Sequence, residues 1–449
     1  MKTILYGREL LKTEIPEDLF REMSSYPDII ETSAIQKVKG RECCRRCHTP
    51  MTEVSADECY CEKKCAYCRN CIQMGKVRLC ESFYFLPDPN QFQTKRETLE
   101  WDVTLSKQQE EAANAIIHSV HQYETRLLWA VAGAGKTEML FPGIEVALEQ
   151  QKRVCIATPR VDVVLELAPR IQKAFPTVQV SVLYGGAKQP YTYSQLVIAT
   201  THQLYRFKEA FDFLIIDEVD AFPFHLDDSL KFAANKARKE KSTLIYLSAT
   251  PDQTMQKEVA RNKLLSTILP ARYHGYALPV PKTKYAPKWR EQLIKNLSKT
   301  IISREMNHRL QSKKRFVVFV PNIEWMKKFE DILRKEFPNH RFEAVHSEDP
   351  NREEKVMQMR QEKLDFILTT TILERGVTFP NIDVLVVGAE DRVFTESALV
   401  QIAGRAGRSP KYPTGQVVYF HDGQSRAMKK AIKQINKMNH LAKKRGLIQ

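Results

Sequence analysis

Two series of short apolar runs, each alternating with helical segments, constrain the fold of this chain more than any other feature. The first series (RLLWAVAG, RVCIATP, QLVIATT, FDFLIIDE, STLIYLSAT) begins near Thr125, and the second (RFVVFVPN, RFEAVHS, LDFILTTT, IDVLVVG, GQVVYF) begins near Arg315. Such runs are typical of parallel strands covered by helices. The sequence therefore predicts an α/β fold with two parallel-sheet domains in tandem.

The composition of the connecting stretches predicts the domain boundaries. The polar segment LPDPNQFQTKRE precedes the first series, and the proline-rich segment ILPARYHGYALPVPKTKYAPK separates the two series, as a linker would. We expect an N-terminal region over 1–100, a first domain over 101–268, a linker over 269–288, and a second domain over 289–449 that ends in a basic helix.

The N-terminal region is marked by cysteines, because nine of the ten in the chain lie between Cys43 and Cys80. The first residues lack the apolar segment of a signal peptide, so we expect a reducing cytosol, where this spacing indicates a metal rather than disulfides. Two Cys-x2-Cys pairs separated by twenty residues fit a zinc ribbon over about 40–82. One Zn²⁺ is predicted on four thiolates, those of Cys44, Cys47, Cys68 and Cys71.

The cysteine pattern leaves two alternatives open. Cys65 and Cys68 form a further Cys-x2-Cys pair, so the register of the ligands is not unique. A second Zn²⁺ would take Cys59, Cys61, Cys65 and Cys80. A reduced or redox-sensing cluster without metal is the other interpretation.

The charge of the chain suits a polyanionic partner. The formal net charge of +15 fits nucleic acid or an anionic membrane surface, and no apolar run is long enough to span a bilayer. The C-terminal stretch predicts an amphipathic helix that contacts DNA, a membrane or a partner, or else packs on the second domain with its lysines in water. These lysines are Lys429, Lys430, Lys433, Lys437, Lys443 and Lys444.

A glycine-rich segment, AVAGAGKT, follows the first apolar run and precedes a helical pattern. Such a turn exposes backbone N–H groups that cradle phosphates, with a lysine for the β and γ oxygens and a hydroxyl for Mg²⁺. The sequence therefore predicts a site for ATP with Mg²⁺ formed by Gly133, Ala134, Gly135, Lys136 and Thr137.

An acidic segment, DEVD, ends the apolar run FLII. Asp217 would help hold Mg²⁺, and Glu218 would polarise the water that attacks the γ-phosphate. An acidic turn after a buried strand is common without function, but the upstream phosphate loop favours the catalytic interpretation.

Near the end of the second series, QIAGRAGR presents two arginines and a glutamine at helical spacing. We expect Gln401, Arg405 and Arg408 to share one helical face and to supply positive charge to the transferring phosphoryl group. Since these residues belong to the second domain, hydrolysis would then couple to motion between domains.

The order of six motifs resembles superfamily 2 DEAD/DEAH-like helicases and translocases, which have two RecA-like domains. The motifs are AVAGAGKT, TPR, DEVD, SAT, TTTILERGVTFP and QIAGRAGR, over roughly residues 101–425. Together with the N-terminal four-cysteine zinc finger, the DEVDAFP form of the acidic motif and LERGVTFP, they resemble the ComFA family of late competence proteins. The chain departs from many relatives at Thr378, where they carry an acidic residue.

The resemblance implies roles for further residues. Gln109 would contact adenine, and Ser248 and Thr250 would couple hydrolysis to movement. The DNA backbone would be followed by Pro159, Arg160, Thr200 and Thr201 in the first domain and by Thr370, Arg375 and Gly376 in the second.

The resemblance also implies the activity and the surroundings. It implies an ATPase stimulated by single-stranded DNA that drives DNA uptake in natural transformation. Its partners would be ComFC, DprA and the membrane DNA channel, at the cytoplasmic face of the membrane, and it leaves room for an oligomer.

Two other functions remain open from the sequence. One is a primosome-restart or recombination helicase, although those relatives carry their cysteines inside the second motor domain. The other is a nucleotide-dependent scaffold that binds DNA or partners with negligible turnover.

Overall fold

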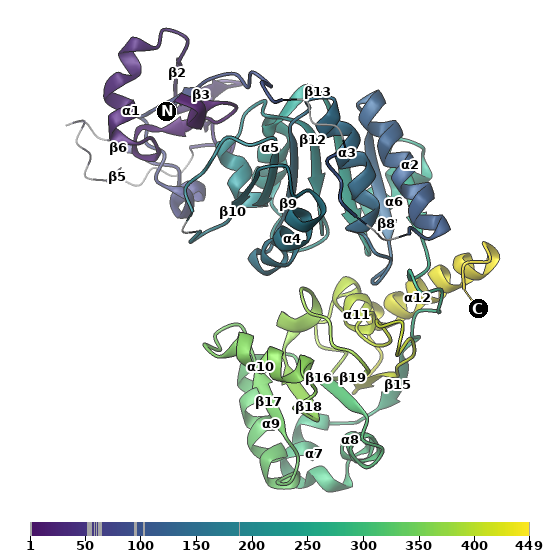
Figure 1. Ribbon diagram of the computed structural model, residues 1–449. Helices are drawn as coiled ribbons and strands as arrows, with labels where there is room; N and C mark the ends of the chain where they lie inside the picture. The colour runs from purple at the N-terminus through teal and green to yellow at the C-terminus, as the bar shows by residue number, and fades with distance from the viewer. Residues whose placement is uncertain are drawn as a thin grey trace. The chain divides into compact units, whose positions relative to one another are not determined.

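The computed structural model describes most of the chain and divides it into two compact units. The described residues are 2–51, 56–57, 59, 61, 65–93, 97–101, 104–187 and 189–448. One unit contains residues 1–128 and 136–267, and the other contains 129–135 and 268–449. Figure 1 labels the elements of both units.

A seven-stranded sheet forms the centre of the first unit, with the order β10-β11-β9-β12-β13-β8-β14. Its strands are β8 (Thr125–Ala130), β9 (Val154–Thr158), β10 (Val180–Leu183), β11 (Leu196–Thr200), β12 (Phe211–Ile216), β13 (Arg238–Ser248) and β14 (Leu265–Leu269). The pairs β10-β11, β11-β9, β9-β12 and β12-β13 are parallel. The apolar runs of the first series thus become buried neighbours in one sheet.

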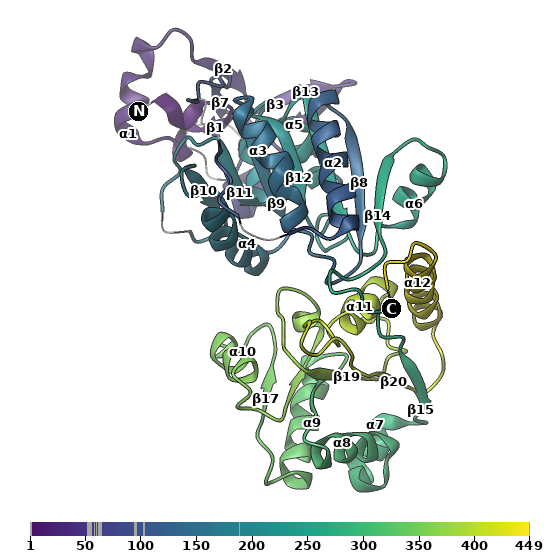
Figure 2. The same cartoon turned by 45° about the vertical axis from the view of Figure 1, so that its right-hand side comes forward.

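Helices cover this sheet. Successive side chains of a strand point to opposite faces, so strands that are apolar throughout present apolar side chains on both faces, and helices bury them. The helices are α2 (Lys107–Gln122), α3 (Phe141–Glu149), α4 (Val161–Ala174), α5 (Asp228–Ala237) and α6 (Gln253–Ala260), with short 3-10 turns η5 (Glu138–Leu140) and η6 (Thr201–Arg206). Helices α2 and α3 lie side by side (Figures 1 and 2). One face of β9, β11 and β12 forms a buried core with α5 and η6.

The second unit is built on a six-stranded sheet with the order β15-β20-β19-β16-β18-β17. The strands are β15 (Lys282–Tyr285), β16 (Arg315–Phe319), β17 (Phe342–Val345), β18 (Phe366–Thr369), β19 (Ile382–Val387) and β20 (Val417–His421). Every neighbouring pair is parallel. Strand β15 lies within the stretch 269–288 that the sequence assigns to a linker, so part of this stretch is an edge strand.

Helices also cover both faces of the second sheet. They are α7 (Trp289–Asn296), α8 (Ile301–Gln311), α9 (Ile323–Glu336), α10 (Arg352–Arg360), α11 (Glu396–Ala403) and α12 (Arg426–Lys444), with 3-10 turns η7 (Leu297–Lys299) and η8 (Thr371–Glu374). Helices α7, α8 and α9 share one buried core with the sheet. Tyr419 faces the other way and donates its hydroxyl proton to the carbonyl of Leu399 in α11, 2.8 Å away. The predicted α/β fold with two parallel-sheet domains is confirmed.

The N-terminal region is a small module within the first unit. Its strands are β1 (Leu10–Leu11), β2 (Ile30–Ser33), β3 (Ile35–Val38), β4 (Arg41–Cys44), β5 (Ala56–Asp57), β6 (Cys65–Ala66) and β7 (Ser82–Phe85). Its helical turns are α1 (Glu17–Glu22), η1 (Lys2–Leu5), η2 (Lys12–Glu14), η3 (Met23–Ser25) and η4 (Arg69–Met74). Strands β1, β7 and β2 form an antiparallel sheet, and β3-β4 and β5-β6 are antiparallel pairs.

Candidate nucleotide and metal sites

The phosphate loop begins where β8 ends, at Ala130. Gly133 and Gly135 have φ angles of +85° and +75°, which only glycine adopts at little cost, so their places in the motif have a backbone reason. The loop leads through Thr137, whose residue is 8% exposed, into the η5 turn and then α3. The backbone therefore has the strand, turn and helical start that a phosphate cradle needs.

The acidic motif follows β12, which β13 alone separates from β8 in the sheet. The amide of Asp217 donates to the carbonyl of Ala157 over 2.8 Å, which ties the motif to the end of β9. The Glu218 amide donates to Asp217 Oδ1, also over 2.8 Å, and Glu218 has a φ of +53°. A non-glycine residue in this region is strained, and such strain is concentrated at functional sites.

A hydrogen-bonded triad links the acidic motif to the SAT motif. Ser248 Oγ donates to Asp220 Oδ1 at 2.7 Å, and Thr250 Oγ1 donates to Asp220 Oδ2 at 2.6 Å. The Thr250 amide donates in turn to Ser248 Oγ at 2.9 Å. Asp220 was missed as a site residue from the sequence, although its place two residues after Glu218 was a signal. The triad thus holds the acidic turn against the end of β13.

The arginine motif of the second unit is arranged differently from the expectation. Helix α11 ends at Ala403, and residues 404–407 form turns. The prediction that Gln401, Arg405 and Arg408 share one helical face is therefore wrong. After Ala403 the amides of Arg405 and Ala406 donate to carbonyls three residues back, as in turns, and Gly407 has a φ of +64°. A Cβ atom at Gly407 would lie 2.4 Å from the Pro413 oxygen, so this position requires glycine.

Both arginines nevertheless meet the same neighbouring segment, residues 374–378. Arg405 Nε donates to the carbonyl of Glu374 at 3.0 Å, and Arg408 Nη1 donates to Thr378 Oγ1 at 3.1 Å. Arg405 is 5% exposed, and its helical neighbour Gln401 is 9% exposed. Thr378, the position at which the chain departs from many relatives, therefore offers Arg408 a neutral hydroxyl as hydrogen-bond acceptor.

Arg272 is a second residue that sequence reasoning missed. Its guanidinium is buried and donates to the carbonyls of Gly404, at 3.2 Å, and Gly407. The next residue, Tyr273, donates its amide to the carbonyl of Gly133 over 3.0 Å. Burial, followed by repulsion from Arg408, lowers the pKa of Arg272 to about 9. Arg272 lies in a proline-rich stretch, and nothing in that stretch signals its contacts with the turn that follows α11.

The residues assigned by resemblance have varied surroundings. Gln109 accepts from the amide and hydroxyl of Ser106, at 2.9 and 2.8 Å, and so completes a capping box at the start of α2. Arg160 lies between β9 and α4 and makes an ion pair of 3.1 Å with Asp162. Pro159 precedes it at the end of β9.

The three threonines, the arginine and the glycine assigned to DNA by resemblance lie at or after the ends of strands. Thr200 ends β11 and Thr201 begins η6, and the two residues are only 4% and 0% exposed. Thr370 follows β18, Arg375 donates to Ser397 Oγ at 3.1 Å, and Gly376 has a φ of +71°.

The cysteine module brings the predicted ligands together. The sulfur atoms of Cys44, Cys47, Cys68 and Cys71 all lie within 4.8 Å of one another. The Cys44–Cys71 and Cys47–Cys68 separations are 3.8 and 3.5 Å. Four thiolates placed 2.3 Å from one Zn²⁺ in a tetrahedron would lie about 3.8 Å apart, so this quartet fits zinc. All four residues are at most 3% exposed, as in a closed structural site.

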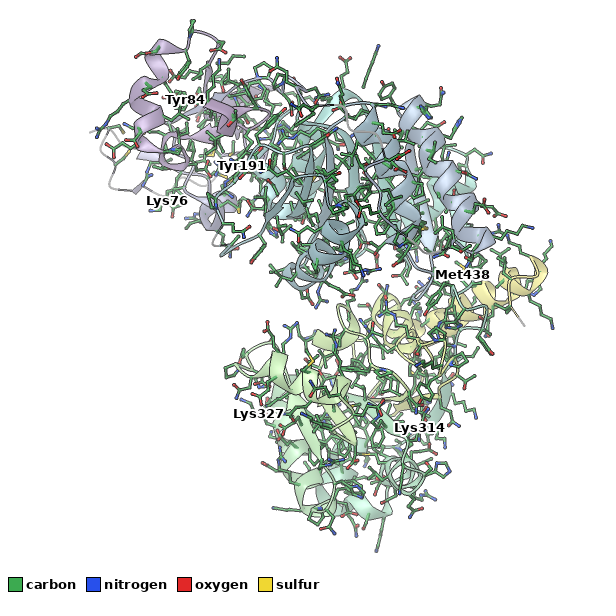
Figure 3. All side chains as sticks on the ribbon, viewed as in Figure 1. Lys76, Tyr84, Tyr191, Lys314, Lys327 and Met438 are labelled. Atoms are coloured by element: carbon green, nitrogen blue, oxygen red, sulfur yellow. The ribbon has the colours of Figure 1, made fainter. Side chains whose placement is uncertain are left out.

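The module is packed tightly on the first sheet. Its four cysteines belong to the same buried core as η6 and α5. Asn70 donates to Ser229 Oγ over 2.9 Å, and the His48 ring stacks on Phe232 at 4.6 Å. The Arg8 guanidinium lies 4.0 Å from the ring centre of Tyr191, which Figure 3 labels. The module is thus an integral part of the first unit.

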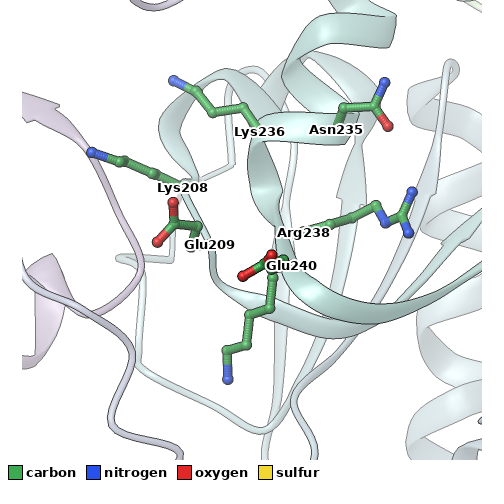
Figure 4. Close-up of a pocket in the computed structure, with 7 residues that line it drawn as sticks. Lys208, Glu209, Asn235, Lys236, Arg238 and Glu240 are labelled. Atoms are coloured by element: carbon green, nitrogen blue, oxygen red, sulfur yellow. The ribbon is translucent and has the colours of Figure 1, made fainter. Parts of the chain in front are cut away.

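Two cavities lie at the amino ends of strands of the first sheet, whereas the acidic motif lies at the carboxyl end of β12. One, of about 380 Å³, is lined by residues that precede β12 and begin β13, among them Lys208, Lys236 and Glu240 (Figure 4). Lys208 and Lys236 pair with Glu9 of the N-terminal module, at 3.8 and 3.0 Å. The other cavity, of about 260 Å³, lies beside Tyr193 and Gln195. Neither contains a residue of the phosphate loop.

The C-terminal helix α12 has one buried and one basic face. Met428, Ile435 and Met438 are buried, and Figure 3 labels Met438 on this helix. Asn439 exchanges two hydrogen bonds with the backbone of Leu278. The six predicted lysines are all exposed. Among the described residues, none of the helices combines the length and the apolar character needed to cross a membrane.

Comparisons with known proteins give three family matches along the chain. They are Competence protein ComFA N-terminal domain over 1–85, Type III restriction enzyme, res subunit over 102–253, and Helicase conserved C-terminal domain over 293–410. The matches follow the order of the cysteine module and the two sheets.

Relatives match over nearly the whole chain. Competence protein ComFA of Bacillus subtilis is 43% identical, covering 99% of this chain and 96% of its own length. Competence protein ComFA of Streptococcus pneumoniae is 37% identical, covering 96% and 97%. Among solved structures, S. cerevisiae Dbp5 bound to RNA and ADP BeF3 has a TM-score of 0.53 at 13% identity, covering 75% of this chain and 92% of that one. This last likeness supports the RecA-like fold.

Proposed function

This chain belongs to the ComFA family of competence proteins, and from that membership we propose that it is an ATP-driven motor for single-stranded DNA in natural transformation. Its helicase-family domains imply ATP-dependent chemistry. The observation that carries the proposal is the placement of a glycine-built phosphate loop and a strained Asp-Glu turn on strands of one sheet, β8 and β12.

The proposed chemistry is hydrolysis of the bond between the β- and γ-phosphates. The loop amides and Lys136 bind the phosphates, Ala134 lies between the two left-handed glycines, and Thr137 and Asp217 would hold Mg²⁺. Both donors are hard oxygen groups, as Mg²⁺ prefers. Glu218 takes the proton of the attacking water, and ADP and phosphate leave. Gln109 would meet the adenine.

Charge stabilisation is assigned to the second unit. Arg405 and Arg408 supply positive charge to the γ-phosphoryl group in the transition state. Gln401, on the same segment, orients the groups around that phosphoryl group. Their shared contacts with residues 374–378 support a common role. The two motor domains in this proposal run over 101–268 and 289–449, joined through 269–288.

Coupling to DNA is assigned to the residues that surround the strand ends. The Asp220 triad connects Glu218 to Ser248 and Thr250, so loss of the γ-phosphate is relayed to the end of β13. The DNA backbone would meet the two sets of residues at strand ends, which are Pro159, Arg160, Thr200, Thr201, Thr370, Arg375 and Gly376.

The module and the C-terminal helix complete the proposal. Zn²⁺ on Cys44, Cys47, Cys68 and Cys71 supplies folding free energy that so short a segment lacks. We propose work at the cytoplasmic face of the membrane, beside the DNA channel, with ComFC and DprA as partners. The exposed lysines of α12 support an anionic surface or partner there.

The experiment is steady-state ATP hydrolysis by the purified full chain without nucleic acid, with single-stranded DNA and with duplex DNA. Lys136→Ala serves as the control for contaminating ATPase. We expect stimulation by single strands that greatly exceeds stimulation by duplex and is absent in Lys136→Ala.

Two outcomes would replace the proposal. Tight DNA binding with no turnover on any nucleic acid would support a scaffold. Stimulation by duplex or forked DNA alone, with strand separation, would support a restart or recombination helicase.

A further inference from the structure

We propose that the module holds a second Zn²⁺, bound by Cys59, Cys61, Cys65 and Cys80. Their four sulfur atoms lie within 4.8 Å of one another, and the Cys59 and Cys80 sulfurs are 3.5 Å apart. These separations match the edge of about 3.8 Å expected for four thiolates around one Zn²⁺. Soft sulfur donors in a closed quartet select zinc over the hard cations that prefer oxygen.

Backbone contacts that do not involve sulfur bring this quartet together. The Leu79 amide donates to the carbonyl of Ala66, and the Cys68 amide donates to the carbonyl of Val77, each over 2.9 Å. These bonds place Cys80 beside Cys65, which is itself held in the short β5-β6 pair. The fold of the segment, and not contact between sulfur atoms, therefore brings Cys80 to Cys65.

The two quartets are interleaved along the sequence. Cys44 and Cys47 are followed by three ligands of the second quartet, then by Cys68 and Cys71 of the first, and last by Cys80. The structure thereby resolves the open register, since Cys68 belongs to the first quartet and Cys65 to the second. Each ion closes a loop that contains ligands of the other, so two ions fix the module more firmly than two sites in series would.

The quartets differ in exposure. The first is at most 3% exposed, whereas in the second only Cys65 is buried and Cys80 lies at the surface. An exposed thiolate site exchanges its metal and reacts with oxidants more readily than a closed one. The second ion is therefore the labile one, and its loss releases the β5-β6 pair while the first site stays closed.

Zn²⁺ binding at the second site releases protons and leaves a net charge that the segment must accommodate. Four thiols lose four protons to solvent and give a zinc tetrathiolate of net charge −2. Basic side chains in the same segment, those of Arg69, Lys76 and Arg78, offset this charge. No oxidant is required, and all ten cysteines are free thiols in the structure.

The test is the zinc content of the full chain, purified under reducing conditions and measured by elemental analysis. We expect two Zn²⁺ per chain in the wild type. The double variant Cys59→Ser with Cys80→Ser is expected to hold one, and so is the double variant Cys44→Ser with Cys71→Ser. Cys43→Ser is the matched control, because Cys43 is buried in the same segment but belongs to neither quartet, and it is expected to keep two.

A second measurement separates the sites by lability. Addition of a chelator to the wild type is expected to release zinc in two phases, and the fast phase disappears in the Cys59→Ser, Cys80→Ser variant. One zinc in the wild type would overturn the proposal. So would two fewer titratable thiols than the ten cysteines under denaturing, non-reducing conditions, since a Cys59–Cys80 disulfide would then occupy the site. Neither readout depends on ATP hydrolysis.

Discussion

The two parallel sheets have the same architecture but carry different chemistry at their strand ends. In the first, β8 ends in a loop whose glycines have left-handed φ angles, and β12 ends in two carboxylates. In the second, β18 leads to Arg375, and α11 leads to Arg405 and Arg408. One sheet thus offers backbone amides and acids, and the other offers guanidinium groups. The proposed ATPase assigns a different task to each set, which is phosphate and Mg²⁺ binding to the first and charge stabilisation to the second.

The largest expected effect is a loss of ATP turnover when an arginine that follows the second sheet is replaced. Arg408→Ala removes one positive charge from the proposed transition-state site, and we expect DNA-stimulated turnover to fall about 10³-fold or more. Arg392→Ala, an exposed arginine of the same unit, is the matched control and should leave turnover unchanged. Wild-type turnover in Arg408→Ala would remove this arginine from the site.

The next effect is a loss of ATP turnover when a carboxylate at the end of β12 is replaced. Glu218→Gln keeps the shape of the side chain but removes the carboxylate that accepts the proton of water, so turnover should fall about 10²- to 10⁴-fold. Binding of a fluorescent ATP analogue should persist. Glu240→Gln, at the opposite edge of the same sheet, is the control and should have neither effect. Loss of analogue binding in Glu218→Gln would indicate a structural role.

Matching buried ion pairs allow each sheet to be weakened separately. Arg153 Nη1 lies 2.6 Å from Asp88 Oδ2 in the first unit, and Arg309 Nε lies 3.0 Å from Asp383 Oδ2 in the second. Replacing either arginine by methionine leaves a buried carboxylate unpaired, which costs about 3–5 kcal/mol. In chemical denaturation, each variant should shift the unfolding of its own unit. A shift below about 1 kcal/mol in both would show that these pairs do not stabilise the sheets.

The smallest effect concerns the pH dependence of the stability that Glu14 contributes where the cysteine module packs on the first sheet. Burial alone would raise the pKa of Glu14, but Arg46 and Arg206 outweigh it and hold that pKa below its ordinary value of 4.5. The charged form is therefore stabilised by folding, so this contribution is present above pH 4.5 and is lost as the pH falls through the lower, folded-state pKa. The pair between Glu14 and Arg206 measures 2.7 Å.

Glu14→Gln should reduce the free energy of unfolding at pH 7 by about 1–2 kcal/mol. The difference from wild type should shrink in the acid range, where the wild-type carboxylate takes up a proton. Thermal unfolding of both proteins from pH 7 to pH 3 measures this difference. A gap that stays constant with pH would exclude the carboxylate charge as its cause.

The sequence predicted the features that depend on local patterns. Apolar runs became neighbouring parallel strands, and the resemblance to the ComFA family is confirmed by full-length relatives. The cysteine spacing predicted a quartet that the structure brings within zinc-binding distance. In each case residues close in sequence carry the signal.

The features that were missed depend on contacts between distant residues. Asp220 gained its role from Ser248 and Thr250, about thirty residues away in the chain, and Arg272 gained its role from a turn that lies 132 residues further on. The helix through Arg408 was expected from spacing, but α11 ends at Ala403 and residues 404–407 form turns packed against the distant Pro413. The packing of the cysteine module on α5 and η6 also left no local signal.

In the proposed mechanism, the loop after β8 binds ATP, and the arginines that follow α11 supply charge for its hydrolysis. The most direct test is to measure ATP-analogue affinity and DNA-stimulated turnover together for Lys136→Ala and Arg405→Ala. We predict that Lys136→Ala loses both, whereas Arg405→Ala keeps near wild-type affinity and loses turnover about 10³-fold. Wild-type turnover in Arg405→Ala, or undiminished affinity in Lys136→Ala, would contradict the claim.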